Sequence, residues 1–216
     1  MDMVSGVGVL DKVATVWRAL ERAGSLSLAD LTAVTGIPRA TLHRLAVAME
    51  SQGLLRRDPQ GEFCLGWWLV SLGHSAENAF PLVALARPIL ERLRDTTGES
   101  VQLYVREADA RRCVVSLEST HGLRWIVPEG ALLPLSAGSA GHVLDGAAVN
   151  KRGWVASVGE REAGVASVSA PVRTRDGVVR AAVSLSGPIE RVSADPGKKY
   201  GSAVVDAAGA LVALIG

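Results

Sequence analysis

At Gly98 the spacing of apolar residues in this chain of 216 residues switches from mainly helical to mainly strand-like. Before Gly98 they recur at three- and four-residue intervals, which is typical of helices with one buried face. Beyond it, Val101, Leu103 and Val105 alternate with polar or aromatic residues, and a period of two is typical of strands. A chain of this length can hold one large domain or two small ones. The change of period therefore predicts two domains, the first helical and the second α+β.

The first 66 residues carry the start and stop signals of three helices, which we expect over residues 9–23, 27–35 and 38–52. Ser27 begins a Ser-x-x-Asp capping signal, and Gly36 ends the second helix. Pro38 suits the first position of the third helix, where no intrahelical N–H bond is made. After Gly53, two short strands are predicted around a turn at residues 58–61. This order of elements is the layout of a winged helix-turn-helix, which binds DNA.

The third helix is predicted to bury one face and to present the other to a DNA groove. The face expected inside carries Leu42, Leu45, Ala46 and Met49, and the face expected outside carries Ala40, His43, Arg44 and Val47. Small residues allow a close approach, and the His43 and Arg44 side chains can reach bases or phosphates. The predicted DNA contacts are Ser27, Arg39, Thr41, His43, Arg44, Arg56 and Arg57. The periodicity leaves an alternative open, because such a helix face is often simply solvated.

Net charge does not favour nucleic acid. The whole chain carries a formal charge of +1, and residues 1–66 hold seven basic and seven acidic side chains. Any affinity for DNA must therefore come from where the arginines point, with help from dimerisation.

The remaining segments are expected to form a connector and a second domain. Residues 67–97 have a helical pattern that breaks near residues 78–81 and ends at Gly98. Strands are predicted in the segments 101–106, 111–119 and 122–130, a hairpin over 165–187 with a turn around Asp176-Gly177, and a last helix over 200–215. The expected domains are a winged helix-turn-helix over 1–66, a helical linker over 67–97 and a ligand-binding domain over 98–216.

The predicted hairpin brings four serines to one side of a sheet. With a two-residue loop at Asp176-Gly177, Ser169 lies opposite Ser184 and Ser167 lies opposite Ser186, and a four-residue loop would keep the same sides together. A buried face of small hydroxyl groups leaves volume unfilled and donors unpaired, which favours a cavity for a small polar ligand. The alternative is a solvent-exposed sheet face, where serine is common.

The stretches "TGIPRATLHRLAVAMESQGLLRRDPQGEFCLG", "GEREAGVASVSAPVR" and "VVRAAVSLSGPIER" give the chain a resemblance to the IclR family of bacterial transcriptional regulators over nearly its whole length. The resemblance implies a ligand-responsive regulator that binds a double-stranded DNA operator as a homodimer or tetramer, with a GAF-like α+β effector domain. In the stretches "SGVGVLDK" and "GEREAGVASVSAPVR", the chain looks most like actinobacterial members that control amino-acid, especially leucine, biosynthesis. The effector-binding positions that the resemblance implies are Leu123, Ser139, Ala140, Ser157, Val165, Ser167, Ser184 and Ser186.

The chain departs from the pattern of this family at three places. Family members more often have an acidic residue near Ser157 and a cysteine near Ser167, so a different effector is expected. The family usually has a longer helical segment after "AGSAGH", where only "VLDGAAVNK" stands here. Either a lid is shortened or residues of that segment are missing from the sequence.

Two other functions are alternative hypotheses. A metabolite sensor that does not bind DNA stays open as an alternative. An esterase-like enzyme would need Ser139 as nucleophile, but "GSAG" does not match G-x-S-x-G and no sequence signal supplies an acid to orient His142. Since a triad is recognised only by geometry, this alternative stays open. The two cysteines and the scattered histidines predict no metal site, no cofactor and no disulfide. No apolar run reaches the roughly 18 residues of a membrane span and the start lacks a signal-peptide pattern, so we expect a cytoplasmic protein.

Overall fold

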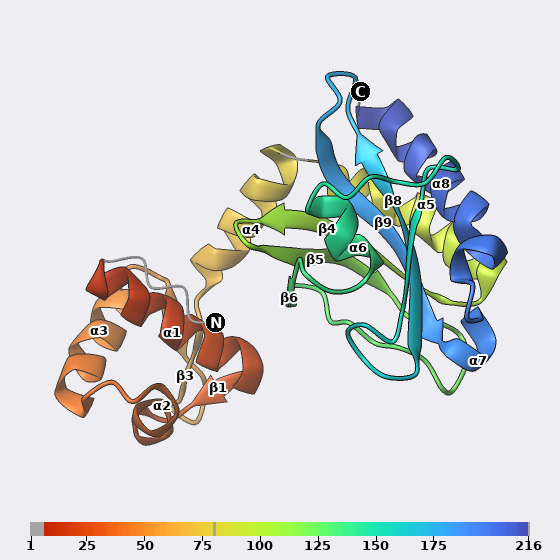
Figure 1. Ribbon diagram of the computed structural model, residues 1–216. Helices are drawn as coiled ribbons and strands as arrows, with labels where there is room; N and C mark the ends of the chain where they lie inside the picture. The colour runs from red at the N-terminus through yellow and green to blue at the C-terminus, as the bar shows by residue number, and fades with distance from the viewer. Residues whose placement is uncertain (1–6, 80, 216) are drawn as a thin grey trace. The chain divides into compact units, whose positions relative to one another are not determined.

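The computed structural model describes residues 7–79 and 81–215. Two compact units divide the chain, Met1–Ala79 and Phe80–Gly216 (Figure 1). The division falls inside the segment 67–97, so that its first helix belongs to one unit and its second helix to the other. The use of 67–97 as a linker between domains stays a prediction. The sequence start at 1–6, Phe80 in the predicted helix break and Gly216 lie outside the described residues.

The first unit consists of three helices, a small sheet and a fourth helix. The helices are α1 (Gly8–Ala23), α2 (Leu28–Thr35), α3 (Arg39–Ser51) and α4 (Trp67–Ala79). The strands β1 (Ser25–Leu26), β2 (Leu55–Arg57) and β3 (Phe63–Leu65) pair antiparallel in the order β1-β3-β2. Leu20 of α1, Leu31 of α2, Leu42 of α3 and Phe63 of β3 meet in one core and are almost completely buried. This packing stabilises the predicted winged helix-turn-helix.

Two details of the first unit differ from the sequence prediction. Strand β1 was not predicted, because its two residues are too few to show a period and it forms only by pairing Ser25 with Cys64 of β3. Pro38 precedes the third helix instead of opening it. Its ψ of 133° is extended, and its carbonyl accepts the first hydrogen bonds of α3 from the N–H groups of Thr41 and Leu42.

The second unit is built on one six-stranded antiparallel sheet with the order β6-β5-β4-β9-β8-β7. Its strands are β4 (Ser100–Glu107), β5 (Ala110–Leu117), β6 (Leu132–Pro134), β7 (Val155–Val158), β8 (Val165–Arg173) and β9 (Val179–Pro188). Its helices are α5 (Leu82–Thr97), α6 (Ser139–Leu144), α7 (Ile189–Val192) and α8 (Pro196–Ile215). The unit is therefore α+β, as predicted.

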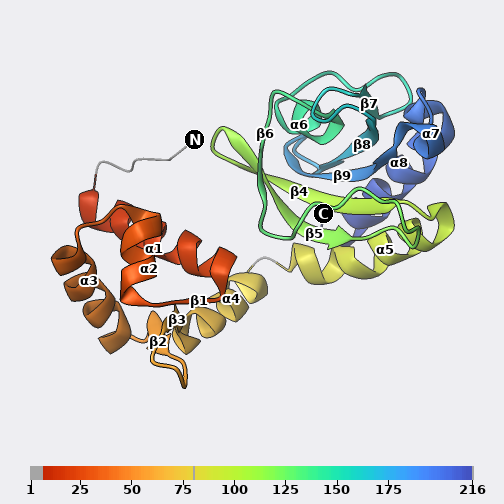
Figure 2. The same ribbon diagram turned by 90° about the horizontal axis from the view of Figure 1, so that it is seen from below.

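The two faces of this sheet have different chemistry. One face packs on α5 and α8 and carries apolar side chains such as Leu103, Val168, Val183 and Leu185. The other face lies under the short helix α6 (Figures 1 and 2). This face carries the serines. Because neighbouring residues of a strand point to opposite faces, the strand period alone separates the helix-packed core from the polar side.

A β-bulge decides which residues of β5 reach the polar face. Leu103 of β4 pairs with Val115 and Tyr104 pairs with Cys113, so Val114 is an extra residue on β5. Because of this extra residue, the alternation of side chains between the two faces of the sheet is shifted by one residue across the bulge. Cys113 and Arg111 consequently lie on the same side as Tyr104, and Val115 packs with the helix-side core.

One prediction for the second unit was wrong, and the length of the hairpin loop, left open by the sequence, is now fixed. Residues 122–130 form no strand, and Trp125 and Val127 instead pack over the α6 side of the sheet. Their alternation imitates a strand because every second residue turns inward. The hairpin loop is longer than two residues, with turn hydrogen bonds between Thr174 and Val178 and between Gly177 and Thr174. A bulge at Val172/Arg173 preserves the predicted serine register.

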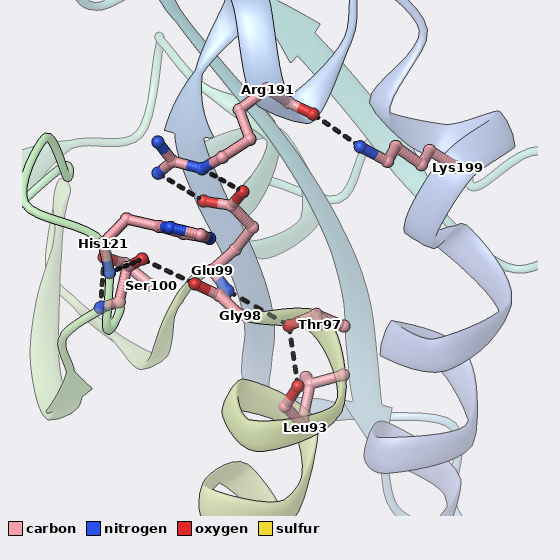
Figure 3. A network of polar contacts seen from close by, with 9 residues as sticks. Leu93, Thr97, Gly98, Glu99, Ser100, His121, Arg191 and Lys199 are labelled. Atoms are coloured by element: carbon pink, nitrogen blue, oxygen red, sulfur yellow. Dashed lines mark hydrogen bonds and ion pairs between the residues drawn. The ribbon is translucent and has the colours of Figure 1, made fainter.

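A buried polar network fastens the end of α5 to the rest of the second unit (Figure 3). The Glu99 side chain is 1% exposed and accepts two hydrogen bonds from Arg191 of α7, at 2.6 and 2.8 Å. Lys199 of α8 donates to the Arg191 carbonyl at 2.6 Å. On the other side, the Ser119 hydroxyl donates to the Gly98 carbonyl at 2.5 Å. The network ties α5, β4, α7 and α8 together.

Candidate functional site

The turn between α2 and α3 is held by local hydrogen bonds. The Ser27 hydroxyl accepts the Asp30 N–H at 3.2 Å and donates to the Asp30 carboxylate at 2.6 Å, so the predicted cap of α2 is confirmed. Gly36 ends α2 with a φ of +67°, in the left-handed region that favours glycine. The chain then needs only Ile37 and Pro38 to enter α3. Such a short turn presents α3 rigidly.

The predicted faces of α3 are confirmed. Leu42, Ala46 and Met49 are buried and Leu45 is partly buried in the same core. The outward residues are all exposed, namely Arg39, Ala40, His43, Arg44 and Val47. Thr41 is half-buried. The outer face is thus small and cationic, and nothing in the described part of the first unit covers it.

The two hairpin arginines have protein partners already. The Arg57 Nε lies 3.3 Å from a Glu50 carboxylate oxygen, and its guanidinium lies 4.1 Å from the centre of the Phe63 ring. The Arg56 guanidinium lies 4.8 Å from the centre of the Trp67 ring. These contacts orient both side chains beside α3. They also make Arg56 and Arg57 less available than Arg39 or Arg44.

A cavity of about 30 Å³ opens on the polar face of the sheet in the second unit. Seven of the eight effector positions implied by the resemblance line it, namely Ser139, Ala140, Ser157, Val165, Ser167, Ser184 and Ser186. Leu123 does not, and its side chain is 72% exposed. The volume is about that of one water molecule, so a larger ligand requires the covering segments to move.

Four serine hydroxyls, those of Ser167, Ser139, Ser169 and Ser184, form a continuous hydrogen-bonded chain beside the cavity, and Ser186 bonds separately to Gln102. Ser139 of α6 contacts the hydroxyls of Ser167 and Ser169 at 2.8 and 2.7 Å. Ser169 donates to Ser184 at 2.9 Å, and Ser186 donates to the Gln102 side-chain carbonyl at 2.9 Å. The predicted pairs Ser169–Ser184 and Ser167–Ser186 are confirmed by the strand register. The polar patch is therefore buried and not a solvated sheet face.

Sequence reasoning missed several cavity residues, among them the buried Tyr104 and Arg111 and the half-buried Trp125. Burial raises the pKa of the Tyr104 phenol, and it raises the pKa of the neighbouring Cys113 thiol to about 12, so both groups are neutral near pH 7. Burial also lowers the pKa of Arg111. One signal was present in the sequence, because an arginine within the apolar strand "RRCVVSL" breaks the expected pattern.

A pair of polar side chains, His142 of α6 and Glu160 of the β7–β8 segment, lies at the edge of the cavity. The His142 ring of α6 lies 2.6 Å from the Glu160 carboxylate, which also accepts the Gly138 N–H at 3.0 Å. Burial alone would raise the pKa of the Glu160 carboxyl, but the hydrogen bonds from Gly138 and His142 outweigh burial and lower it. Next to Glu160 in the chain, the Arg161 guanidinium lies 4.8 Å from the centre of the Trp125 ring. These contacts hold the segment between β7 and β8 over the cavity.

Both units match family models. Residues 9–59 match the IclR helix-turn-helix domain, and residues 74–148 and 145–213 match the C-terminal domain of the bacterial transcriptional regulator IclR. The chain belongs to the IclR family. An IclR-family protein is a DNA-binding transcriptional regulator with an effector-binding C-terminal domain, and the two units correspond to these two parts.

Individual relatives agree with the family match. The transcriptional repressor IclR of Escherichia coli (strain K12) is 27% identical over 87% of this chain and 82% of its own length. The glycerol operon regulatory protein of Streptomyces griseus is 27% identical over 97% of this chain and 96% of its own length. An IclR homologue of Microbacterium hydrocarbonoxydans, solved with 4-hydroxybenzoate, superposes with a TM-score of 0.79 at 23% identity and covers 95% of this chain and 98% of that one.

Membership of the IclR family bears on the other functions considered. The family is regulatory and not enzymatic, and its relatives include the acetate operon repressor of Salmonella typhimurium. The serine at the start of α6 is accordingly part of the polar cavity floor. Among residues 7–79 and 81–215, no helix is long and apolar enough to cross a membrane.

The C-terminal IclR model is matched in two segments that meet at residues 145–148. This is the short stretch "VLDGAAVNK", where the family usually has a longer helical segment. In the structure α6 ends at Leu144 and β7 begins at Val155. None of residues 145–154 lines the cavity, whereas Glu160 and Arg161 of the β7–β8 segment do.

Proposed function

We propose that this protein is a ligand-responsive regulator that binds a double-stranded DNA operator through the outward face of α3. The observation that carries the proposal is the exposure of Arg39, His43 and Arg44 on a helix whose other face is locked in a core. In a helix-turn-helix, this second helix enters the major groove and its first turns contact base edges. Ala40 and Val47 are small enough to allow that approach.

The other predicted DNA contacts have supporting roles in this proposal. Thr41 lies in the first turn of α3, and Arg56 and Arg57 flank it on the hairpin, where they would grip backbone phosphate. The Ser27 hydroxyl is engaged by Asp30 at the start of α2. Its contact with DNA remains a prediction, separate from its role as a cap.

Dimerisation through the first unit is part of the proposal, with a tetramer as the larger assembly. Leu10 on the first turns of α1 is 57% exposed, and on α4 Trp67 and Trp68 are 71% and 49% exposed. Exposed apolar side chains gathered on two helices favour contact with a second apolar surface. A second copy of the same chain supplies one, and two copies would set the spacing of the operator half-sites.

The effector is proposed to bind in the serine-lined cavity and to change the spacing or association of the subunits. Coupling between the two sites would be about 1–3 kcal/mol. The sequence resemblance favours a role like that of the actinobacterial regulators of amino-acid, especially leucine, metabolism. It also favours a GAF-like fold for the effector domain. A relative of the same fold was solved with 4-hydroxybenzoate, so amino acids and aromatic acids are the first compounds to test. A cytoplasmic location is part of the proposal, because a DNA operator is its target.

The DNA proposal is tested by fluorescence anisotropy with duplexes from the region upstream of its own gene. We expect affinity to fall steeply with salt, because each phosphate contact releases counterions. Arg44→Ala should weaken specific binding by about 1–3 kcal/mol. Arg180→Ala, an exposed arginine of the second unit, is the control and should bind as the wild type does. Binding that is insensitive to salt, or equal loss in both variants, would contradict the proposal and favour a metabolite sensor without DNA binding.

A further inference from the structure

Three buried nitrogen donors in the second unit have no hydrogen-bond partner among the described residues, namely Gln102 Nε2, Arg111 Nε and Trp125 Nε1. Arg111 and Trp125 line the serine cavity. Gln102 lies next to it, because its carbonyl oxygen accepts the hydroxyl of Ser186, which also lines the cavity. Unpartnered buried groups are rare and each costs about 1–3 kcal/mol. All three donate and none accepts, so the site lacks acceptor atoms.

Arg111 also lacks a counter-charge. Its residue is 3% exposed, and its Nη1 donates to the backbone carbonyls of Pro134 and Ala137, the latter at 2.8 Å. No carboxylate forms an ion pair with it within the described ranges. Its guanidinium lies 5.3 Å from the centre of the neutral Tyr104 ring. A buried cation without an anion is costly, and a ligand that brings the anion removes that cost.

The acidic residues of the cavity do not supply this charge. Glu160 already accepts hydrogen bonds from Gly138 and His142 at the mouth. Glu162 is exposed to solvent. Arg161, stacked on Trp125, adds a second cation to the lining. The inner part of the cavity is therefore positive, and the acids lie at its rim.

The surrounding backbone is shaped to hold the Arg111 guanidinium in place. A Cβ atom at Gly141 of α6 would lie 2.2 Å from Arg111 Nη1, and one at Gly138 would lie 3.2 Å from Nη2. Any side chain at Gly141 would thus displace the guanidinium. Arg111 is packed in a fixed orientation against α6, as a recognition group requires.

We propose that the effector is a small organic acid whose carboxylate binds at the Arg111 and Trp125 side of the cavity. The carboxylate accepts from the free Arg111 and Trp125 N–H groups, and a polar substituent of the same molecule reaches the hydroxyls of Ser184 and Ser186 beside Gln102. Arg111 is a specificity-determining residue, since it selects carboxylates over neutral molecules of the same shape. This inference rests on the proposed effector function of the same cavity.

The test compares small acids with their own neutral amides by thermal shift on the full chain. The panel contains aliphatic, hydroxy, keto, amino and aromatic acids, including leucine and 4-hydroxybenzoate, each paired with leucinamide, 4-hydroxybenzamide or the corresponding primary amide. We expect at least one acid to raise the melting temperature and its amide to do so far less. Arg111→Met should raise the Kd of that acid by about ten- to hundredfold and remove the preference over the amide.

Two further variants keep the result interpretable. Arg111→Lys keeps a donor for the Pro134 and Ala137 carbonyls, so it should fold even where Arg111→Met does not. Because it also keeps the positive charge, it should keep a weaker preference for the acid. Ser184→Ala should weaken acid and amide alike and leave the preference unchanged. Equal shifts by acids and amides, a preference that survives in Arg111→Met, or no shift by any acid would each overturn the carboxylate proposal. Acid binding that is retained by a protein without salt-dependent DNA binding would instead overturn the regulator proposal alone.

Discussion

Ser27 is a residue for which a capping role and a DNA-contact role make different predictions. Because its hydroxyl pairs with the Asp30 N–H and carboxylate, Ser27→Ala should lower the free energy of unfolding of the first unit by about 1 kcal/mol. Ser27→Asn is the control, since asparagine caps equally well. Urea unfolding of both variants measures the effect. If the alanine variant is as stable as the wild type, the cap contributes nothing measurable and the DNA role of the hydroxyl becomes the stronger explanation.

At the scale of elements, the Glu99–Arg191 pair joins the end of α5 to α7. Arg191→Met would leave the Glu99 carboxylate buried without a partner, while the Arg191 side chain itself is 26% exposed. We therefore expect the free energy of unfolding to fall by about 3 kcal/mol, the lower end of the range for breaking a buried pair. Chemical denaturation of the full chain measures the loss.

The control for this pair is a double variant. Adding Glu99→Gln to Arg191→Met removes the unpaired charge, so it should recover part of the lost stability. Lys199→Met removes only the hydrogen bond to the Arg191 carbonyl and should cost much less. A loss in Arg191→Met no greater than that in Lys199→Met would mean that the ion pair does not hold α7.

At the scale of the whole molecule, the assembly is expected to depend on the exposed apolar residues of α1 and α4. Leu10→Glu combined with Trp68→Glu should convert the proposed dimer to monomer, because charges cannot be buried in an apolar interface. Both side chains are about half exposed or more, so the monomer should remain folded. Sedimentation velocity measures the state, and DNA affinity should fall with it.

The matched control is Leu214→Glu, which places the same charge on an exposed apolar residue of α8 in the second unit. It should leave the dimer intact. A dimer that survives the α1 and α4 changes but not the Leu214 change would locate the interface on the second unit instead.

Local patterns predicted the elements whose residues are neighbours in sequence. The faces of α3 followed from the spacing of Leu42, Ala46 and Met49, because a helix places residues three and four apart on one side. The serine pairs followed from the hairpin, because the position of its loop predicts which residues face each other, and the bulge at Val172/Arg173 offsets the longer loop. Strand β1 and the path of residues 122–130 could not be predicted, since partners distant in sequence decide whether a short extended segment pairs or packs.

Periods and turns within single segments were enough to predict the two-part architecture, the outward arginines of α3 and the hydroxyl face of the β8–β9 hairpin. The position of Arg111 beside those serines follows instead from contacts between distant segments. The bulge at Val114 places Arg111 on the serine-bearing face of the sheet. The backbone of Gly138 and Gly141 at α6 then covers its guanidinium. Side-chain burial of that kind depends on contacts between segments far apart in the chain, and no local pattern encodes them.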